Sequence, residues 1–177
     1  NGSFTFFFTN SAWNVGSAIA SVDWITPTSW SLSISWPPTL SLGATSVNSS
    51  VNLLEKTFTG ASEYFQVEDT IWADAGYYTT LEMTNLQYNT QTIANTNMYV
   101  KTVGGITLLS GTANANVITS IGTTYTNISS PLTFIMRSAW SNGGKTGTYW
   151  AQLAIKVDIP AFQKAGNYTW TIIYTIY

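Results

Sequence analysis

The sequence predicts an all-β protein, a single antiparallel β-sandwich. The first reason is a series of short segments, rich in Thr, Ile, Val, Tyr and Trp, in which apolar and polar residues alternate with the period of a strand. The second is that no long window repeats its apolar positions with the period of a helix. The third is that glycine, proline and asparagine separate the segments at the regular intervals of a sandwich. The 177 residues suffice for one domain with a substantial core.

The first nine residues form an unusually apolar strand. Phe4, Phe6 and Phe8 fall on one face when this segment is extended. Chain ends are mobile unless they dock in a sheet, and an exposed apolar strand is a template for pairing with another chain. Residues 10–17 have the small polar residues and glycine of a hinge. We therefore expect a strand at 1–9 that folds back or enters a neighbouring molecule, a hinge at 10–17 and a sandwich at 18–177.

The first half of the sandwich segment reads as a series of strands. Residues 29–36 alternate most regularly before Pro37-Pro38 ends the strand. This alternation predicts that Trp30 and Trp36 lie in the core, on one face with Leu32 and Ile34. Residues 85–97 are polar and are predicted to be a loop. The other predicted strands in this half are 18–25, 39–42, 47–54, 63–72 and 77–84.

The second half contains a predicted hairpin and two long strands. Gly104-Gly105 joins residues 98–103 to 106–109, and two-residue glycine connections suit tight hairpins because primed turns need positive φ. Residues 148–159 and residues 167–177 each alternate along their whole length. Shorter strands are predicted at 117–121, 125–128 and 132–137. The complete pattern favours an immunoglobulin-like or pilin-like sandwich.

The composition excludes most kinds of catalysis. The chain has no histidine and no cysteine, which nucleophilic triads and most acid–base schemes require. Its densest acidic group, Glu63, Glu68, Asp69 and Asp74, reads as a solvated loop-and-turn region. No spacing of the acidic residues resembles a calcium-binding loop. The net charge is −2 and the basic residues do not cluster, so binding to a nucleic-acid backbone has no electrostatic support. We expect no enzyme activity, no cofactor and no metal.

The surface and the start of the chain suggest export. Only 8% of the residues are charged, so the surface must be built from hydroxyl and amide side chains. The chain starts without Met and without a signal sequence, which we interpret as a mature form after signal-peptide removal. No apolar run approaches the roughly 20 residues of a spanning helix. We expect an extracellular, cell-surface protein with N-glycans as covalent partners, and the candidate sites are Asn1, Asn48, Asn127 and Asn167.

The layout of these segments resembles that of donor-strand-complemented surface filament subunits, most closely the archaeal thread filaments, whose fold is similar to bacterial type I pilins. The likeness lies in the Phe-rich strand, the small-residue hinge, the low-charge sandwich with sequons and the strand that runs to Tyr177. A second resemblance is to secreted biofilm-fibre proteins of the TasA kind, through residues 79–85 and 97–100. The chain departs from type I pilins in having no cysteine, which puts the bacterial chaperone–usher route in doubt.

The resemblance implies an incomplete sandwich whose hydrophobic groove is filled by the N-terminal strand of the next subunit. The predicted function is then that of a structural subunit of an extracellular filament, polymerised head to tail from copies of the same chain and serving adhesion, cell contact or biofilm. The floor of the groove is expected on the two long alternating strands. The candidate residues are Leu153, Ile155, Val157, Trp170, Ile172 and Tyr174.

Two alternative functions remain open from the sequence. One is a secreted carbohydrate-binding or adhesin module, because the chain has eight tryptophans and ten tyrosines that could stack on sugars. Trp13, Trp72, Trp140 and Trp150 are the tryptophans least committed to the core. The other is a viral jelly-roll coat protein, which two four-stranded sheets would also produce.

Overall fold

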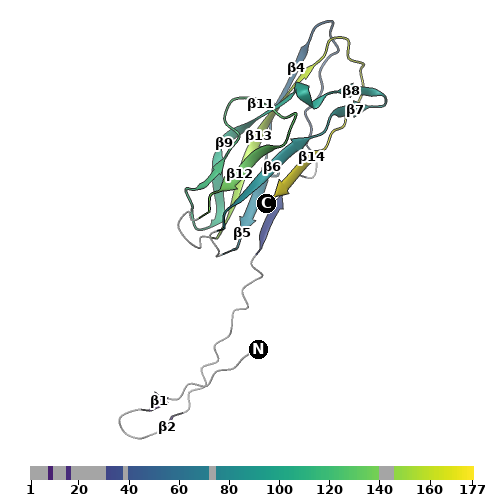
Figure 1. Cartoon of the computed structure of the whole chain (residues 1–177). Coiled ribbons are helices and arrows are strands. Elements are labelled where there is room, and N and C mark those ends of the chain that lie inside the picture. The colour runs from purple at the N-terminus through teal and green to yellow at the C-terminus, as the bar shows by residue number, and fades with distance from the viewer. Residues whose placement is uncertain (1–7, 10–14, 17–30, 38–39, 72–74, 140–145) are drawn as a thin grey trace.

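A computed structural model describes residues 8–9, 15–16, 31–37, 40–71, 75–139 and 146–177 (Figure 1). It confirms the predicted fold class, because the described chain is built from antiparallel strands and contains no α-helix. The strands are β1 (Phe8–Thr9), β2 (Val15–Gly16), β3 (Leu32–Ser35), β4 (Asn52–Thr57), β5 (Phe65–Asp69), β6 (Tyr77–Met83), β7 (Leu86–Tyr88), β8 (Gln91–Ile93), β9 (Met98–Gly111), β10 (Val117–Thr119), β11 (Thr126–Asn127), β12 (Leu132–Arg137), β13 (Gly147–Ile159) and β14 (Ile172–Ile176), with a 3₁₀ turn η1 (Asn95–Asn97) before β9.

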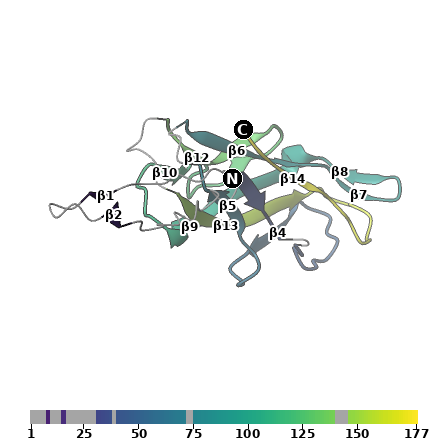
Figure 2. The same ribbon diagram turned by 90° about the horizontal axis from the view of Figure 1, so that it is seen from below.

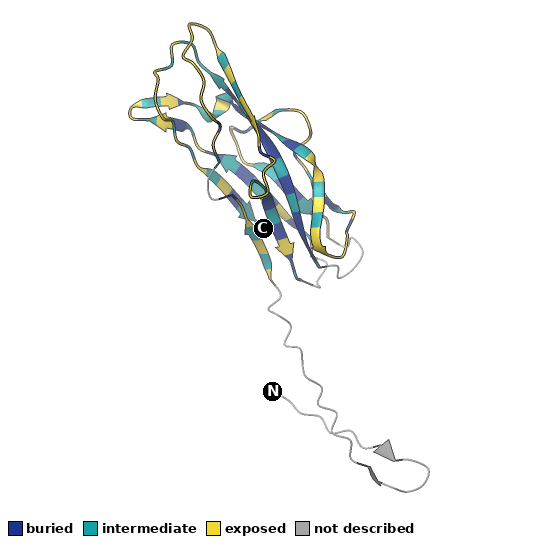
Figure 3. Cartoon of the chain, turned by 180° about the vertical axis from the view of Figure 1, so that it is seen from behind, coloured by how far each residue is buried: buried dark blue, intermediate teal, exposed yellow. Residues whose placement is uncertain are grey.

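Two main sheets form the sandwich (Figures 1 and 2). One has four strands in the order β10-β12-β6-β14, and the other has the order β11-β9-β13-β5-β3, with β4 also paired to β13. Phe65 of the larger sheet meets Phe134 and Tyr174 of the smaller sheet edge to face, with ring centroids 5.7 and 5.3 Å away. These three rings form the centre of the core, and buried residues lie on the strands between the sheets (Figure 3).

Strand β13 organises the larger sheet. Along one edge it pairs with β9, and along the other it pairs first with β5 through residues 147–151 and then with β4 through residues 154–159. Its inward side chains from Tyr149 to Val157 are at most 3% exposed. The predicted strand at 148–159 is therefore confirmed. At roughly 3.3 Å per residue, its 13 residues span about 40 Å, nearly the whole length of the domain.

The two ends of β13 define the two poles of the sandwich. Gly147 pairs with Asp69, and Asp69 pairs with Leu32, the first residue of β3. The described part of the sandwich therefore begins at this end, which we call the entry pole. At the opposite pole lie Ile159, the start of β4 and the β7–β8 hairpin, towards the top of Figure 1.

The predicted hairpin at Gly104-Gly105 is wrong. Strand β9 runs through both glycines, and its two halves pair with β13 rather than with each other. Val103 is opposite Gln152 and Thr107 is opposite Trp150, so three residues of β9 face one residue of β13. The glycines thus form a β-bulge, in which the φ of +73° at Gly104 is accommodated without strain.

Several other predictions need correction. Residues 85–97 are not a loop, because they form the β7–β8 hairpin and η1. Residues 39–42 are not a strand, since the described ones, 40–42, pair with no neighbour in a ladder. Trp36 is not in the core: its side chain is 49% exposed at the open edge between β3 and β14, with its ring 6.4 Å from that of Tyr174. The last strand is shorter than predicted, although a bridge between Gln87 and Thr169 continues its pairing towards the N-terminal side.

The N-terminal predictions lie mostly outside the described residues. Within 1–17 only a short antiparallel pairing is described, in which Phe8 is opposite Gly16 and Thr9 is opposite Val15. Phe4, Phe6, the side chain of Phe8, Trp30 and the predicted strand at 18–25 are outside the described part of the chain.

Candidate functional site

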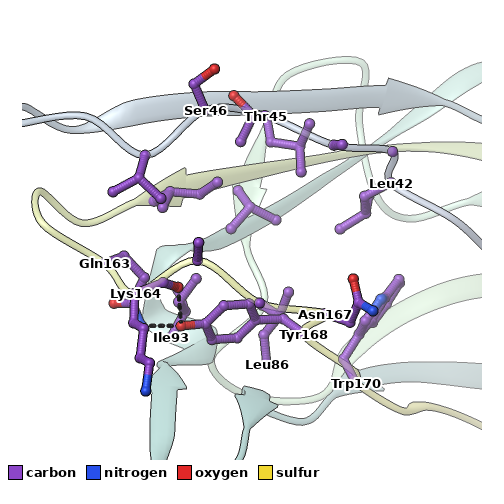
Figure 4. A pocket seen from close by; sticks show the side chains of 18 of the residues that line it. Leu42, Thr45, Ser46, Leu86, Ile93, Gln163, Lys164, Asn167, Tyr168 and Trp170 are labelled. Atoms are coloured by element: carbon purple, nitrogen blue, oxygen red, sulfur yellow. Dashed lines mark hydrogen bonds between the residues drawn. The ribbon is translucent and has the colours of Figure 1, made fainter.

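An apolar groove opens at the pole opposite the chain entry (Figure 4). Its volume is about 380 Å³. Residues 40–47 and β4 form one side, and residues 163–170 with the β7–β8 hairpin form the other. The apolar lining residues, which make most of its surface, are Leu40, Leu42, Val47, Leu54, Leu86, Ile93, Val157, Ile159, Tyr168 and Trp170.

The first wall, residues 40–47, has an unusual backbone. Among the described residues, no backbone–backbone hydrogen bond joins it to another segment. Instead, the Asn52 side chain holds it, donating to Thr45 Oγ1 at 2.7 Å and to the Ser46 carbonyl at 2.8 Å. Leu42 turns inward and is only 8% exposed, so side chains fix the wall. The Ser46 carbonyl and the Gly43 N–H, which donates to Ser41 Oγ, are hydrogen-bonded, and the other peptide groups of the wall remain available for pairing among the described residues.

The second wall, residues 163–170, is braced by Tyr168. Its hydroxyl accepts a hydrogen bond from Gln163 Nε2 at 2.6 Å and donates one to the Lys164 carbonyl at 2.9 Å (Figure 4). Its ring lies 5.7 Å from that of Tyr88 on β7, and Gly166 sits against the same Tyr88 ring, with no room for a Cβ. The wall is therefore held to the β7–β8 hairpin by close aromatic packing.

A turn at residues 160–163 joins the two walls. The Phe162 N–H donates to the carbonyl of Asn48, next to the first wall, at 2.9 Å. Phe162 has a φ of +58°, and its side chain is 78% exposed. Phe162 is not among the lining residues, but its backbone is bound next to the first wall and its ring packs against little of its own chain.

The structure separates the six predicted groove residues into two groups. Val157 and Trp170 line this groove. Leu153, Ile155, Ile172 and Tyr174 belong to the core between the two sheets and are not among its lining residues. Sequence reasoning missed the first wall, because residues 40–47 show only a brief alternation of Leu40 and Leu42 and no strand pattern beyond it.

The candidate glycosylation sites differ in their surroundings. Asn48 and Asn167 are exposed, and Asn167 lies at the rim of the groove (Figure 4). Asn127 is half-buried, and its amide nitrogen donates to the carbonyls of Thr96 at 2.6 Å and Met98 at 3.2 Å. Its side-chain oxygen accepts from the Ser129 N–H at 2.9 Å, so this amide has a structural role. Asn1 lies outside the described residues.

The acidic group is not the uniformly solvated region that the sequence suggests. Asp69 is buried and forms an ion pair of 2.6 Å with Arg137, while Glu63 accepts a hydrogen bond from the Gly60 N–H. Glu68 is exposed, and Asp74 lies outside the described residues. No three acidic side chains gather as possible metal ligands in the part of the chain that the structure describes.

The tryptophans named for sugar binding are only partly described. Trp150 lies on the outer face of the larger sheet, half-buried beside Tyr64, with ring centroids 5.5 Å apart. Trp13, Trp72 and Trp140 are outside the described residues. A continuous aromatic platform is therefore not assembled by the tryptophans that can be placed.

No known family model matches the chain, and no curated protein resembles it in sequence. Within the described residues, no helix has the length and apolar character needed to cross a membrane. The largely apolar lining of the groove, and a first wall that belongs to no ladder, suit an extended apolar segment more than a charged or reactive ligand.

Proposed function

We propose that the chain is a structural subunit of an extracellular filament, polymerised head to tail by a strand that each copy donates to the next. The observation that carries this proposal is the opposed placement of the chain entry and the groove. The described sandwich begins with β3 at Leu32, which Asp69 separates from Gly147 at one end of β13. The groove includes Ile159 at the other end of β13. A segment that precedes Leu32 in one copy and fills the groove of another joins the two head to tail, and such a contact repeats without closing.

The size and lining of the groove suit the phenylalanine strand. A dry cavity of roughly 150 Å³ lined by Leu, Ile and Phe holds one benzene, so a groove of about 380 Å³ suits about two phenyl rings. Phe4, Phe6 and Phe8 present three rings on one face of an extended segment, and the groove has room for about two of them. Burying each enclosed ring contributes about 1.5–3 kcal/mol. The peptide groups of residues 40–47 that have no backbone partner can add ladder hydrogen bonds, and the two contributions together offset the entropic cost of ordering the strand.

Two full-length variants test this function by complementation. The donor variant, Phe4→Ser with Phe6→Ser and Phe8→Ser, keeps the groove but loses the apolar strand. The acceptor variant, Ala44→Trp, keeps the strand but fills the groove with an indole, since Ala44 is an exposed lining residue. Neither is expected to form filaments alone under the electron microscope. When the two are mixed, the strand of the acceptor variant can enter the open groove of the donor variant, and no further copy can add. Size-exclusion chromatography with light scattering should therefore detect one-to-one dimers.

The matched controls are Ala115→Trp, at an exposed alanine away from the groove, and Thr5→Ser with Thr9→Ser on the opposite face of the strand. Both should still polymerise. Filaments from the donor variant alone would remove the role of the phenylalanines. Stable monomers of the unmodified chain would favour the carbohydrate-binding module, and closed shells would favour the coat protein.

A further inference from the structure

We propose that Phe162 anchors the outer face of the incoming strand, so that the N-terminal segment of a second copy is held on both of its faces. This inference rests on the proposed function of the groove. It assigns a contact outside the groove and names its partner, Phe7 of the second copy.

The exposure of Phe162 sets it apart from the other apolar side chains. At 78%, it is the most exposed of the large hydrophobic residues that the structure describes. It stands where the two walls of the groove meet, because its N–H bonds to the Asn48 carbonyl, and neighbouring Val47 is 50% exposed at the groove itself. Two exposed apolar side chains, Val47 and Phe162, therefore belong to backbone segments that meet at the Asn48–Phe162 hydrogen bond, and exposed apolar residues gathered in this way are typical of a binding surface.

The backbone of Phe162 supports the same conclusion. Two described residues other than glycine have positive φ, Asn89 at 51° and Phe162 at 58°. Asparagine is common in this conformation, whereas a bulky residue there is strained. The turn would form more easily with asparagine or glycine, so the phenylalanine ring opposes the stability of the free domain. Contact with a partner would supply the interactions that this strained and exposed ring lacks within its own chain.

The partner follows from the sequence of the incoming strand. Phe4, Phe6 and Phe8 share one face, and Phe7 points to the other. The groove can enclose the first face only, which leaves Phe7 directed outward at the rim. Phe162 offers that ring an aromatic neighbour, and aromatic pairs gain interaction energy beyond the area they bury. The pairing would also fix the register of the strand, since a shift by one residue would exchange the two faces.

Binding of a synthetic peptide tests the contact. Three proteins would be compared, each built on the full-length donor variant, which has an open groove. One retains Phe162, one carries Phe162→Asn and one carries Phe162→Tyr. Each would be titrated with a fluorescent peptide of residues 2–10. We expect the asparagine variant to bind at least about fivefold more weakly, as for an anchor residue, and the tyrosine variant to bind within about twofold of the parent. The unfolding midpoint of the asparagine variant should be equal to or higher than the parent's, because the strain is relieved.

A second peptide, with Phe7→Ser, identifies the partner. It should bind the parent more weakly than the native peptide does, but the asparagine variant should not distinguish the two peptides. Equal affinity of all three proteins for the native peptide would overturn the role of Phe162. If Phe162→Asn lowers the affinity for the native peptide and for the Phe7→Ser peptide by the same factor, the pairing of Phe162 with Phe7 is overturned. Failure of every protein to bind the native peptide would overturn the proposed function and this contact with it.

Discussion

Asp69 and Arg137 form a buried ion pair that joins the two sheets at the entry pole. Asp69 ends β5 of the larger sheet, Arg137 ends β12 of the smaller sheet, and their closest atoms, Oδ2 and Nη1, are 2.6 Å apart. The two side chains are 2% and 3% exposed. The other carboxylate oxygen accepts from the Ile71 N–H, and the guanidinium lies over the Tyr77 ring. The pair is therefore a buried charged contact between the two sheets in a chain with few charges.

Breaking this pair should destabilise the domain strongly. Asp69→Asn and Arg137→Met each leave one buried charge without its opposite, so each should lower the free energy of unfolding by about 3–5 kcal/mol in urea titrations. The double variant Asp69→Asn with Arg137→Met should cost less than either single change, because neither charge remains. A double variant that loses the sum of the two single effects would show that the residues act independently.

Gly166 should tolerate no side chain. A Cβ at this position would overlap the Tyr88 ring, so Gly166→Ala must displace the second wall of the groove. We expect a loss of about 1–3 kcal/mol in unfolding free energy and weaker binding of the 2–10 peptide. Gly105→Ala is the matched control, since a Cβ there meets nothing within 4 Å, and it should change stability by less than about 0.5 kcal/mol. Equal effects of the two substitutions would contradict the packing described for Tyr88.

Asn127 should matter for stability rather than for carbohydrate attachment. Asn127→Ala removes the hydrogen bonds of this side chain to the exposed Thr96 carbonyl and Ser129 N–H, and each is expected to cost about 0.5–1.5 kcal/mol in unfolding free energy. Asn48→Ala, at an exposed site, should be nearly neutral. Peptide mass spectrometry of protein from its natural source should find residue 127 unmodified, and a glycan there would refute this assignment.

The domain should lose stability in alkali. Burial raises the pKa of Tyr77, with the charge of Asp69 adding to the effect, and burial also raises the pKa of Tyr174. As the pH rises, the unfolded chain releases these protons near pH 10, before the folded chain does. The contribution of the two tyrosines to the free energy of unfolding is therefore fully present below about pH 10, and above it falls by about 1.4 kcal/mol per pH unit for each group. Urea titrations across this range, compared with a Tyr77→Phe and Tyr174→Phe variant, should give a shallower slope for the variant.

Local alternation was enough to predict the fold class and most strands. In β13 every second side chain is buried under the facing sheet, so the alternation within this one segment is enough to predict which of its side chains are buried. Gly104-Gly105 shows the limit of local signals. The same two glycines suit a hairpin or a bulge, and the choice depends on pairing with β13, which lies far along the chain.

The groove illustrates a second limit. Its first wall has no strand pattern because it belongs to no ladder. Which of its residues line the groove depends on the segments that face them, and the periodicity of the sequence does not show this. The burial of Asp69 was equally hidden, since its partner Arg137 lies on the other sheet. The sequence could indicate an apolar strand at the start of the chain, but not the place of a groove that would receive it.

The way the chain enters the sandwich determines how the domain bears mechanical load. Ser31 is tied to Thr70 by its backbone carbonyl and N–H, and β3 then runs inward, antiparallel to β5, from the entry pole. A pull on Ser31 directed away from the domain acts along the strands. The β3–β5 hydrogen bonds are then sheared together rather than opened one after another, so a tether leaving at this end resists tension with its whole ladder at once.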